Sequence, residues 1–357
     1  MRTIRDVSDL KKVRASLSGT LGLVPTMGAL HEGHLSLVRM AKSECDHVGV
    51  SIFVNPSQFG ANEDLNRYPR DLERDLKLLE PLGVDLVWAP SPEIVYPPAF
   101  QTWVTVEDVS QGMEGSRRPG HFRGVATVVA KLLNIFTPDK AYFGQKDAQQ
   151  LVVIKRMVKD LNFPITVRAC PTAREADGLA LSSRNAYLNP EERRAAPVLF
   201  RALSVACAAY ERGERNANSL RTTMKAVLDE EPLARMDYVS AANPETLAEA
   251  DLAEDGLLLS LAVRIGETRL VDNILLPPGD RKMELPEELN KSEIRTAQGR
   301  HPSQIVLRRV KDKTYATHLK VMPPDAEPYY ILGGYFFKLE EAEADFQRRK
   351  LEIEGVP

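Results

Sequence analysis

The chain has 357 residues, 43% of them hydrophobic and 27% charged, which predicts a globular protein of two or three domains. Its formal net charge of −3 disfavours a general nucleic-acid binder, and no apolar run is long enough to span a membrane. Three widely spaced cysteines and a polar N-terminus without signal-peptide character favour a reducing, cytoplasmic location.

The first half of the chain alternates short apolar runs with amphipathic segments, beginning with the apolar run Leu21–Val24. Strands separated by helical patterns indicate an α/β fold, a parallel sheet with helices on both faces. Ligands of such sheets bind beyond the carboxyl ends of the strands. The further segments expected as strands are Val48–Val54, Leu86–Ala89, Trp103–Val106, Ala141–Phe143 and Ile165–Ala169, and those expected as helices are Asp71–Leu82, Val125–Phe136 and Asp147–Leu161.

From about Ala173 the pattern changes to that of a smaller α+β domain. Its expected helices are Pro190–Arg212 and Asn218–Asp229, and its expected strands are Arg235–Ala241, Leu257–Ile265 and Thr268–Leu275, the last two joined by a hairpin at Gly266 and Glu267.

A third unit follows a charged, proline-containing stretch. Its expected elements are three strands, Gln304–Val310, Thr314–Val321 and Tyr329–Phe337, and a helix, Lys338–Ile353. We therefore predict domains at residues 1–172 and 173–278, a linker at 279–293 and an accessory α+β unit at 294–357.

The most informative motif is the stretch Val24–Leu35, in which His31 and His34 follow an apolar run and a Pro-Thr-Met-Gly turn. A helix beginning near Leu30 would place both imidazoles in its first turn, beside unpaired amides at the positive end of the helix dipole. Such a turn suits a polyphosphate. The alternatives are two solvated histidines at a helix start, or a zinc site, although zinc motifs of this kind space their histidines four apart.

Four further segments carry polar or basic side chains, and three of them suit a polar substrate or a phosphate group. Asn55 and Gln58 end a buried strand, Lys146 and Asp147 open a helix that also carries Gln150, and two hydroxyls precede Arg184. The fourth, a basic loop at Arg117–Gly124, precedes an apolar helix. This loop could gate the site or hold an interface, whereas each of the first three segments alone is typical of a capped turn or a solvated loop.

Together these segments resemble the pantothenate synthetase family of pantoate–β-alanine ligases, within the His-x-Gly-His nucleotidylyltransferase superfamily. The matching pieces span residues 1–278 and are Pro25–Leu35, Phe53–Gly60, Arg118–Val129, Tyr142–Gln150 and Asp177–Tyr187. The resemblance implies a Rossmann-like doubly wound ATP domain, a smaller lid-like domain, a homodimer, ATP as co-substrate and Mg²⁺. The unit at 294–357 has no counterpart in this family.

The resemblance also implies roles for individual residues. Gln58 and Gln150 would bind the substrate, His34 would be the proton donor, and His31, Lys146 and Arg184 would stabilise phosphate charge. Ala173 stands where many members have Val, and Leu181 where many have Met. The residues implied in ATP binding are Met27, Gly28, Ala29, Leu30, His31, Glu32, Gly33, His34, Gly144, Gln145, Lys146, Asp147, Ala173, Leu181, Ser182, Ser183 and Arg184.

The implied reaction condenses pantoate with β-alanine through pantoyl adenylate and releases AMP and pyrophosphate, with neither nucleic acid nor membrane as a partner. One alternative is another nucleotidylyltransferase, which would lack the paired Gln58 and Gln150. The other is a protein that kept the fold without catalysis, which would have lost a histidine, Lys146 or Arg184.

Overall fold

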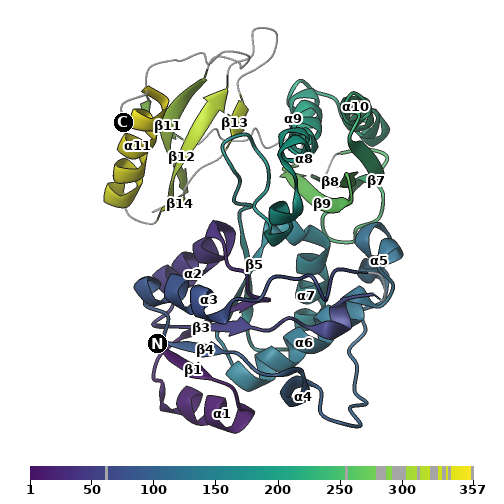
Figure 1. Cartoon of the computed structure of the whole chain (residues 1–357). Helices are drawn as coiled ribbons and strands as arrows, with labels where there is room; N and C mark the ends of the chain where they lie inside the picture. The colour runs from purple at the N-terminus through teal and green to yellow at the C-terminus, as the bar shows by residue number, and fades with distance from the viewer. Residues whose placement is uncertain are drawn as a thin grey trace. The chain divides into compact units, whose positions relative to one another are not determined.

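The computed structural model describes residues 1–60, 63–253, 256–278, 287–291, 303–311, 314–321, 329–331, 335–336 and 339–354. It divides into two compact units, one of residues 1–172 with 244–248 and one comprising the rest (Figure 1). Across the described ranges, no helix combines the length and apolarity needed to cross a membrane.

The first unit is built on a six-stranded parallel sheet in the order β1-β4-β3-β2-β5-β6. The strands are β1 (Arg2–Ile4), β2 (Leu21–Thr26), β3 (His47–Ile52), β4 (Leu86–Trp88), β5 (Lys140–Gly144) and β6 (Thr166–Cys170). The helices are α1 (Val7–Ser16), α2 (Glu32–Glu44), α3 (Leu72–Leu79), α4 (Pro92–Val95), α5 (Met113–Arg117), α6 (His121–Phe136) and α7 (Ala148–Asp160). The 3₁₀ turns are η1 (Pro56–Gln58), η2 (Glu80–Leu82), η3 (Asp108–Ser110) and η4 (Gln145–Asp147).

Helices cover both faces of this sheet, as the sequence predicts. Side chains alternate across a strand, so Leu23 packs into the core formed with α6 and α7, whereas its neighbour Val24 packs into the core formed with α2 and α3. Leu86 and Val87 of β4 divide in the same way. The expected Rossmann-like doubly wound fold is therefore confirmed.

The expected strand Trp103–Val106 is wrong. These four residues run without strand pairing, although their composition favours a strand. Trp103 stacks on Tyr96, with ring centroids 5.9 Å apart, and the guanidinium of Arg123 lies 4.7 Å from its ring centre. The N–H of Val104 donates to the Thr127 hydroxyl at 3.0 Å, so contacts with α6 replace a strand ladder.

The second unit contains an antiparallel sheet and three helices that share one apolar core. The sheet order is β7 (Ala234–Ala242), β8 (Leu257–Ile265) and β9 (Thr268–Leu276), with the hairpin at Gly266 as predicted. The helices are α8 (Pro190–Ala195), α9 (Val198–Glu211) and α10 (Ala217–Asp229), and η5 (Ser183–Tyr187) is a 3₁₀ turn. The single helix expected over Pro190–Arg212 is wrong, because Pro197, which lacks an N–H, separates α8 from α9.

The C-terminal residues form a further antiparallel sheet, β10 (Glu287–Lys291), β11 (Ser303–Lys311), β12 (Thr314–Val321) and β13 (Tyr329–Ile331), with β14 (Tyr335–Phe336) paired to β12. Helix α11 (Leu339–Glu354) packs Ala342 and Phe346 against Ile305 and Leu307 of β11. The expected linker at 279–293 is corrected over Glu287–Lys291, since these residues form β10, paired with β11. The rest of that linker, apart from these residues, lies outside the described residues.

Candidate active site

The candidate site lies where the order of the parallel strands reverses, between the central strand β2 and its neighbour β5. The ladder between them contains only Gly22–Lys140 and Leu23–Ala141, although β2 continues to Thr26 and β5 to Gly144. Open α/β sheets bind ligands at the carboxyl ends of the strands at such a reversal. The predicted segment Met27–His34 follows β2, and the predicted segment Gly144–Asp147 begins at the last residue of β5.

His31 and His34 cap the start of α2. His31 is the N-cap, one residue before the helix, and its Nδ1 accepts the N–H of Gly33 at 3.2 Å. The Nδ1 of His34 accepts the N–H of His31 at 3.4 Å, and the two ring centroids are 4.2 Å apart. The helix thus begins two residues later than predicted, yet both imidazoles lie at its N-terminus as expected.

This capping determines which ring nitrogen carries the proton. An Nδ1 that accepts an N–H is unprotonated, so the neutral forms of His31 and His34 both carry their hydrogen on Nε2. Burial, with the positive charge of Lys146 adding to it, lowers the pKa of His31 to about 4. Burial and the neighbouring His31 lower the pKa of His34 to about 3. At neutral pH the pair therefore presents two Nε2–H donors.

Asp75 holds the turn that carries these histidines, and it was not among the residues predicted from the sequence. Its side chain is 1% exposed, and its carboxylate accepts the N–H groups of Ala29 at 2.9 Å and Leu30 at 2.8 Å. Burial raises the pKa of Asp75, against those two hydrogen bonds. The available signal was an acidic residue on the apolar face of α3, between Leu72 and Leu79.

Lys146 and Asp147 form the turn η4 after β5, and their charges reach the histidines. The Nζ of Lys146 lies 3.5 Å from Oδ1 of Asp147. The Lys146 ammonium lowers the pKa of both His31 and His34, and the Asp147 carboxylate opposes it. Gln150 is the third residue of α7, half-buried and one turn beyond this pair.

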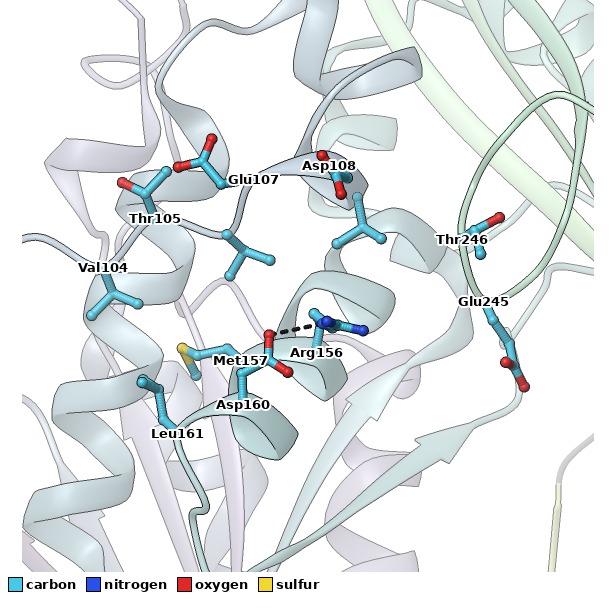
Figure 2. A pocket seen from close by; sticks show the side chains of 12 residues that line it. Val104, Thr105, Glu107, Asp108, Arg156, Met157, Asp160, Leu161, Glu245 and Thr246 are labelled. Carbon is cyan, nitrogen blue, oxygen red and sulfur yellow. Dashed lines mark hydrogen bonds and ion pairs between the residues drawn. The ribbon is translucent and has the colours of Figure 1, made fainter.

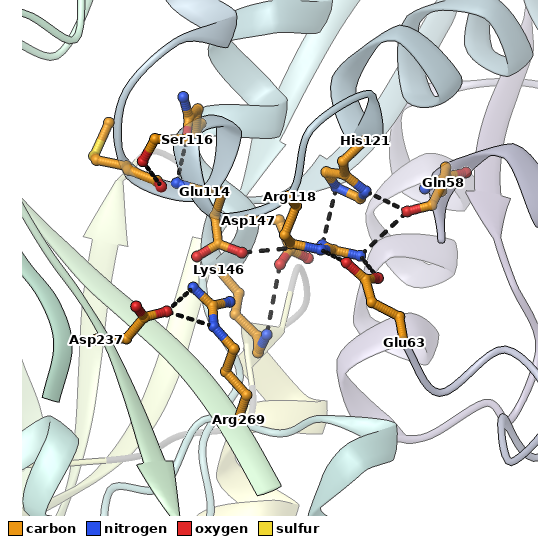
Figure 3. Close-up of polar contacts among 12 residues, drawn as sticks. Gln58, Glu63, Glu114, Ser116, Arg118, His121, Lys146, Asp147, Asp237 and Arg269 are labelled. Carbon is orange, nitrogen blue, oxygen red and sulfur yellow. Dashed lines mark hydrogen bonds and ion pairs between the residues drawn. The ribbon is translucent and has the colours of Figure 1, made fainter. Parts of the chain in front are cut away.

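Gln58 ends η1, and hydrogen bonds fix both its side chain and its backbone carbonyl, the latter shown in Figure 3. Its Oε1 accepts from Nδ2 of Asn55 at 2.8 Å. Its backbone carbonyl accepts from Nδ1 of His121 at 2.8 Å and from Nη2 of Arg118 at 3.3 Å. Because a carbonyl only accepts, the His121 proton lies on Nδ1 and its Nε2 accepts from Arg118 at 3.1 Å.

Arg118 and His121 were expected only as part of a basic loop, and the structure gives them definite partners. Nε and Nη2 of Arg118 bind the two carboxylate oxygens of Glu63 at 2.8 and 2.6 Å. Burial and the Arg118 charge lower the pKa of His121 to about 4. The loop is shorter than the predicted Arg117–Gly124, because α5 ends at Arg117 and α6 begins at His121, four residues before the expected helix start at Val125.

The remaining predicted residues, Ala173 and Leu181–Arg184, belong to the second unit. The Ala173 carbonyl accepts the N–H of Leu181 at 2.9 Å, and the Ser182 hydroxyl caps η5 through the N–H of Arg184 at 3.3 Å. The same loop is anchored by Arg174, whose guanidinium binds both carboxylate oxygens of Asp272 at 2.5 and 2.8 Å. The hydroxyls and Arg184 thus lie on one ordered turn.

Two other features of the described residues bear on the site. They contain no group of three or more His, Cys, Asp or Glu side chains able to hold a metal, so the zinc alternative for His31 and His34 finds no third ligand there.

A cavity of about 420 Å³ lies between residues 104–109, the end of α7 and Glu245–Thr246 (Figure 2). None of the predicted site residues lines it.

Comparison with known proteins supports the same interpretation. Residues 1–275 match the family model described as pantoate-beta-alanine ligase. Pantothenate synthetases of Roseiflexus sp. (strain RS-1) and Chloroflexus aurantiacus (strain ATCC 29366 / DSM 635 / J-10-fl) are 60% and 59% identical to the chain. Each match covers 77% of this chain, and 99% and 98% of the relative, respectively.

Solved structures agree with the sequence matches. The pantothenate synthetase of Thermus thermophilus has a TM-score of 0.75 and 49% identity, covering 78% of this chain and 100% of that one. The pantoate-beta-alanine ligase of Francisella tularensis, complexed with beta-gamma ATP and β-alanine, has a TM-score of 0.64 and 36% identity, covering 77% and 97%. With the family model matching more than three-quarters of its length, the chain belongs to the pantoate–β-alanine ligase family of enzymes.

Proposed function

We propose that this enzyme joins pantoate to β-alanine, uses ATP as co-substrate and forms pantothenate through pantoyl adenylate. One observation carries the proposal: two neutral imidazoles present Nε2–H donors at the start of α2, within electrostatic reach of Lys146, where the sheet reverses its strand order. Two findings support the choice of substrates: the chain belongs to this family, and the Francisella relative was solved with beta-gamma ATP and with β-alanine.

In the first step, a carboxylate oxygen of pantoate bonds to the α-phosphorus of ATP while the bond to the bridging oxygen of the β-phosphate breaks. Negative charge grows on the phosphate oxygens and on the departing pyrophosphate. His31 and His34 donate Nε2–H groups to these oxygens, and the Lys146 ammonium neutralises charge. A preorganised donor of this kind contributes about 10²–10³ in rate.

In the second step, the amine nitrogen of β-alanine bonds to the acyl carbon, AMP leaves with the electron pair of the broken acyl–phosphate bond, and the nitrogen loses a proton. Gln58 and Gln150 orient pantoate through their amides. The family resemblance assigns the remaining nucleotide contacts to Met27–His34, Gly144–Asp147, Ala173 and Leu181–Arg184, with Arg184 acting on the pyrophosphate.

Mg²⁺ fits this scheme as an ion that arrives with ATP. The described residues offer it no three-ligand protein cage. Mg²⁺ in nucleotide sites keeps several waters and is held largely by phosphates. It supplies charge neutralisation on the phosphate oxygens, to which Lys146 adds.

We also propose a location, an oligomeric state, partners and domain limits for this enzyme. Family resemblance supports a cytoplasmic homodimer acting on small molecules, with no nucleic-acid or membrane partner. The domain limits 1–172 and 173–278 remain proposals, as does an accessory role for residues 294–357, which lie beyond the 275 residues matched by the family model.

The test is isotope exchange between pyrophosphate and ATP in the purified enzyme. Exchange should require pantoate and Mg²⁺ but not β-alanine, and adding β-alanine should yield AMP and pantothenate in equal amounts. Exchange that ignores pantoate would favour another nucleotidylyltransferase, and exchange that needs β-alanine would contradict the adenylate intermediate.

A further inference from the structure

Gln149 is a buried amide that neither the predicted site nor the proposed reaction uses. It is the second residue of α7, 5% exposed, and all of its hydrogen bonds go to one irregular segment. Its Oε1 accepts the N–H of Glu114 at 2.9 Å. Its Nε2 donates to the carbonyls of Gln111 at 2.8 Å and Val109 at 3.2 Å. One side chain therefore connects the end of η3 to the first turn of α5.

The segment needs this support because α5 begins without a cap of its own. The first N–H groups of a helix have no partner within the helix, and a side-chain oxygen at the N-cap normally accepts one of them. The N-cap of α5 is Gly112, which has no side chain and a φ of +65°. Glu114 is the second residue of α5, so Oε1 of Gln149 acts as the missing cap from a different helix.

Helix α5 in turn positions Arg118 at the candidate site. Arg118 is the C-cap of α5, and its N–H donates to the Glu114 carbonyl at 2.8 Å. Its guanidinium lies 3.9 Å from the Glu114 carboxylate and reaches the backbone carbonyl of Gln58. Figure 3 shows Glu114, Arg118 and Gln58 in this order. Glu114 is thus tied to Gln149 through its N–H and to Arg118 through its carbonyl and carboxylate.

We infer that Gln149 is a positioning residue for pantoate binding, acting on Gln58 through α5 and Arg118. The inference rests on the proposed function, in which Gln58 and Gln150 bind pantoate. Gln149 precedes Gln150 on α7, so the first turn of one helix sets both substrate amides: Gln150 directly and Gln58 through the capped α5.

The decisive variant is Gln149→Met, which keeps the length and volume of the side chain and removes every hydrogen bond. The KM for pantoate should rise about tenfold, the effect of losing roughly one hydrogen bond to a site element, while the KM for ATP stays within about twofold of wild type. A matched control is Thr127→Val, which removes buried hydrogen bonds to Val104 and Arg123 without touching α5. The control should leave the KM for pantoate unchanged.

A second readout does not depend on activity. Hydrogen exchange of the amides in Met113–Arg117 should be about tenfold faster in Gln149→Met and unchanged in Thr127→Val, because only the first variant removes the cap. Should Gln149→Met fail to fold, Gln149→Glu keeps the acceptor for Glu114 but turns an oxygen toward the carbonyls of Val109 and Gln111, and it should also raise the KM for pantoate.

The outcomes separate this inference from the proposed function. A wild-type enzyme that does not use pantoate would refute the proposed function, whereas the exchange measurement would still test the cap. A wild-type enzyme that uses pantoate, with an unchanged pantoate KM in the folded Gln149 variants, would refute the positioning role. Equal rises in the KM values for pantoate and ATP would also refute it, since they would indicate a general structural defect.

Discussion

At the scale of single residues, the two histidines of the α2 cap have unequal structural roles. His31 is the N-cap, and its Nδ1 accepts the N–H of Gly33 at 3.2 Å. His34 accepts the N–H of His31 in a longer hydrogen bond of 3.4 Å. His31→Ala should therefore lower the free energy of unfolding by about 0.5–2 kcal/mol, the usual effect of losing an N-cap. His34 is the cleaner variant for testing the chemistry.

His34→Ala should slow pyrophosphate exchange by about 10²-fold or more, because it removes one Nε2–H donor from the transition state. Thermal unfolding should change little. Lys146→Ala should lower the exchange rate similarly, through loss of a phosphate-directed cation. Exchange at the wild-type rate in a folded His34→Ala protein would remove His34 from the mechanism.

Asp75→Asn tests the support beneath the histidines. An amide can accept only one of the N–H groups of Ala29 and Leu30 and turns its own NH₂ toward the other. The free energy of unfolding should fall by about 1–3 kcal/mol, and the KM for ATP should rise because the turn before His31 moves. Urea unfolding and ATP kinetics check this. The substitution Asp71→Asn is a control, since an Asn N-cap of α3 still accepts the N–H of Arg74.

At the scale of elements, a helix or strand was predicted correctly where its pattern lies within a short stretch of sequence. Helix α3 was predicted because Leu72, Leu76 and Leu79 share one face and Gly83 gives a stop signal. In the structure Asp71 caps the helix, and Gly83, with a φ of +66°, ends the turn that follows. Strand β1 has three residues and β10 lies in a charged stretch, so neither carries a pattern long enough to recognise. The Trp103 segment has a strand composition, and its contacts with Tyr96 and α6 override it.

The same rule applies to the candidate site. His31, His34 and Lys146 follow strand ends and belong to short motifs, so their placement was predictable. Asp75, His121 and Gln149 act through partners about 30 to 65 residues away in the chain. No local pattern reports such a partner. The positions of Asp75 on the apolar face of α3 and of His121 in a basic loop are local signals, but only the folded arrangement reveals what these side chains bind.

The close approach of η1 to α6 gives a prediction at this scale. A Cβ added at Gly124 would lie 2.2 Å from the carbonyl oxygen of Ser57, which belongs to η1. Gly124→Ala should therefore displace η1, lower the free energy of unfolding by about 1–3 kcal/mol and raise the KM for pantoate. Gly60→Ala is the control, because among the described residues the nearest contact of its added Cβ would be the Glu63 side chain at 3.7 Å, an ordinary van der Waals distance. Equal behaviour of the two variants would contradict this account.

At the scale of the whole molecule, three histidines make stability depend on pH. The pKa values of His31, His34 and His121 fall to about 4, 3 and 4, below the ordinary histidine value of 6.5. Between pH 6.5 and about 4 the unfolded chain therefore binds more protons than the folded one. The free energy of unfolding should drop as pH falls, by up to about 1.4 kcal/mol per pH unit for each histidine.

His121→Gln should make the free energy of unfolding depend less steeply on pH, by up to the contribution of one titrating group. Urea unfolding at pH 7, 6 and 5 measures this dependence. Gln retains a side-chain N–H for the Gln58 carbonyl but does not titrate. A slope equal to that of the wild type would show that His121 does not titrate differently in the folded and unfolded chains.

Removing the C-terminal residues tests the proposed accessory unit. The matches to the Roseiflexus and Chloroflexus relatives cover 99% and 98% of those proteins but only 77% of this chain. A protein ending near Asp280 should accordingly fold and make pantothenate with wild-type turnover. Light scattering of the short and full proteins would reveal a role in assembly. A folded but inactive short protein would mean that the C-terminal residues contribute to the active site.

The α2 cap has a consequence for how the enzyme fails on heating. Helix ends fray at lower free energy than the core unfolds, and here the rings that hold the helix end are also the proposed phosphate ligands. Every molecule whose first α2 turn has opened therefore lacks both donors, while its sheet remains intact. Thermal inactivation should begin below the temperature at which the secondary structure melts, and bound nucleotide should narrow that interval.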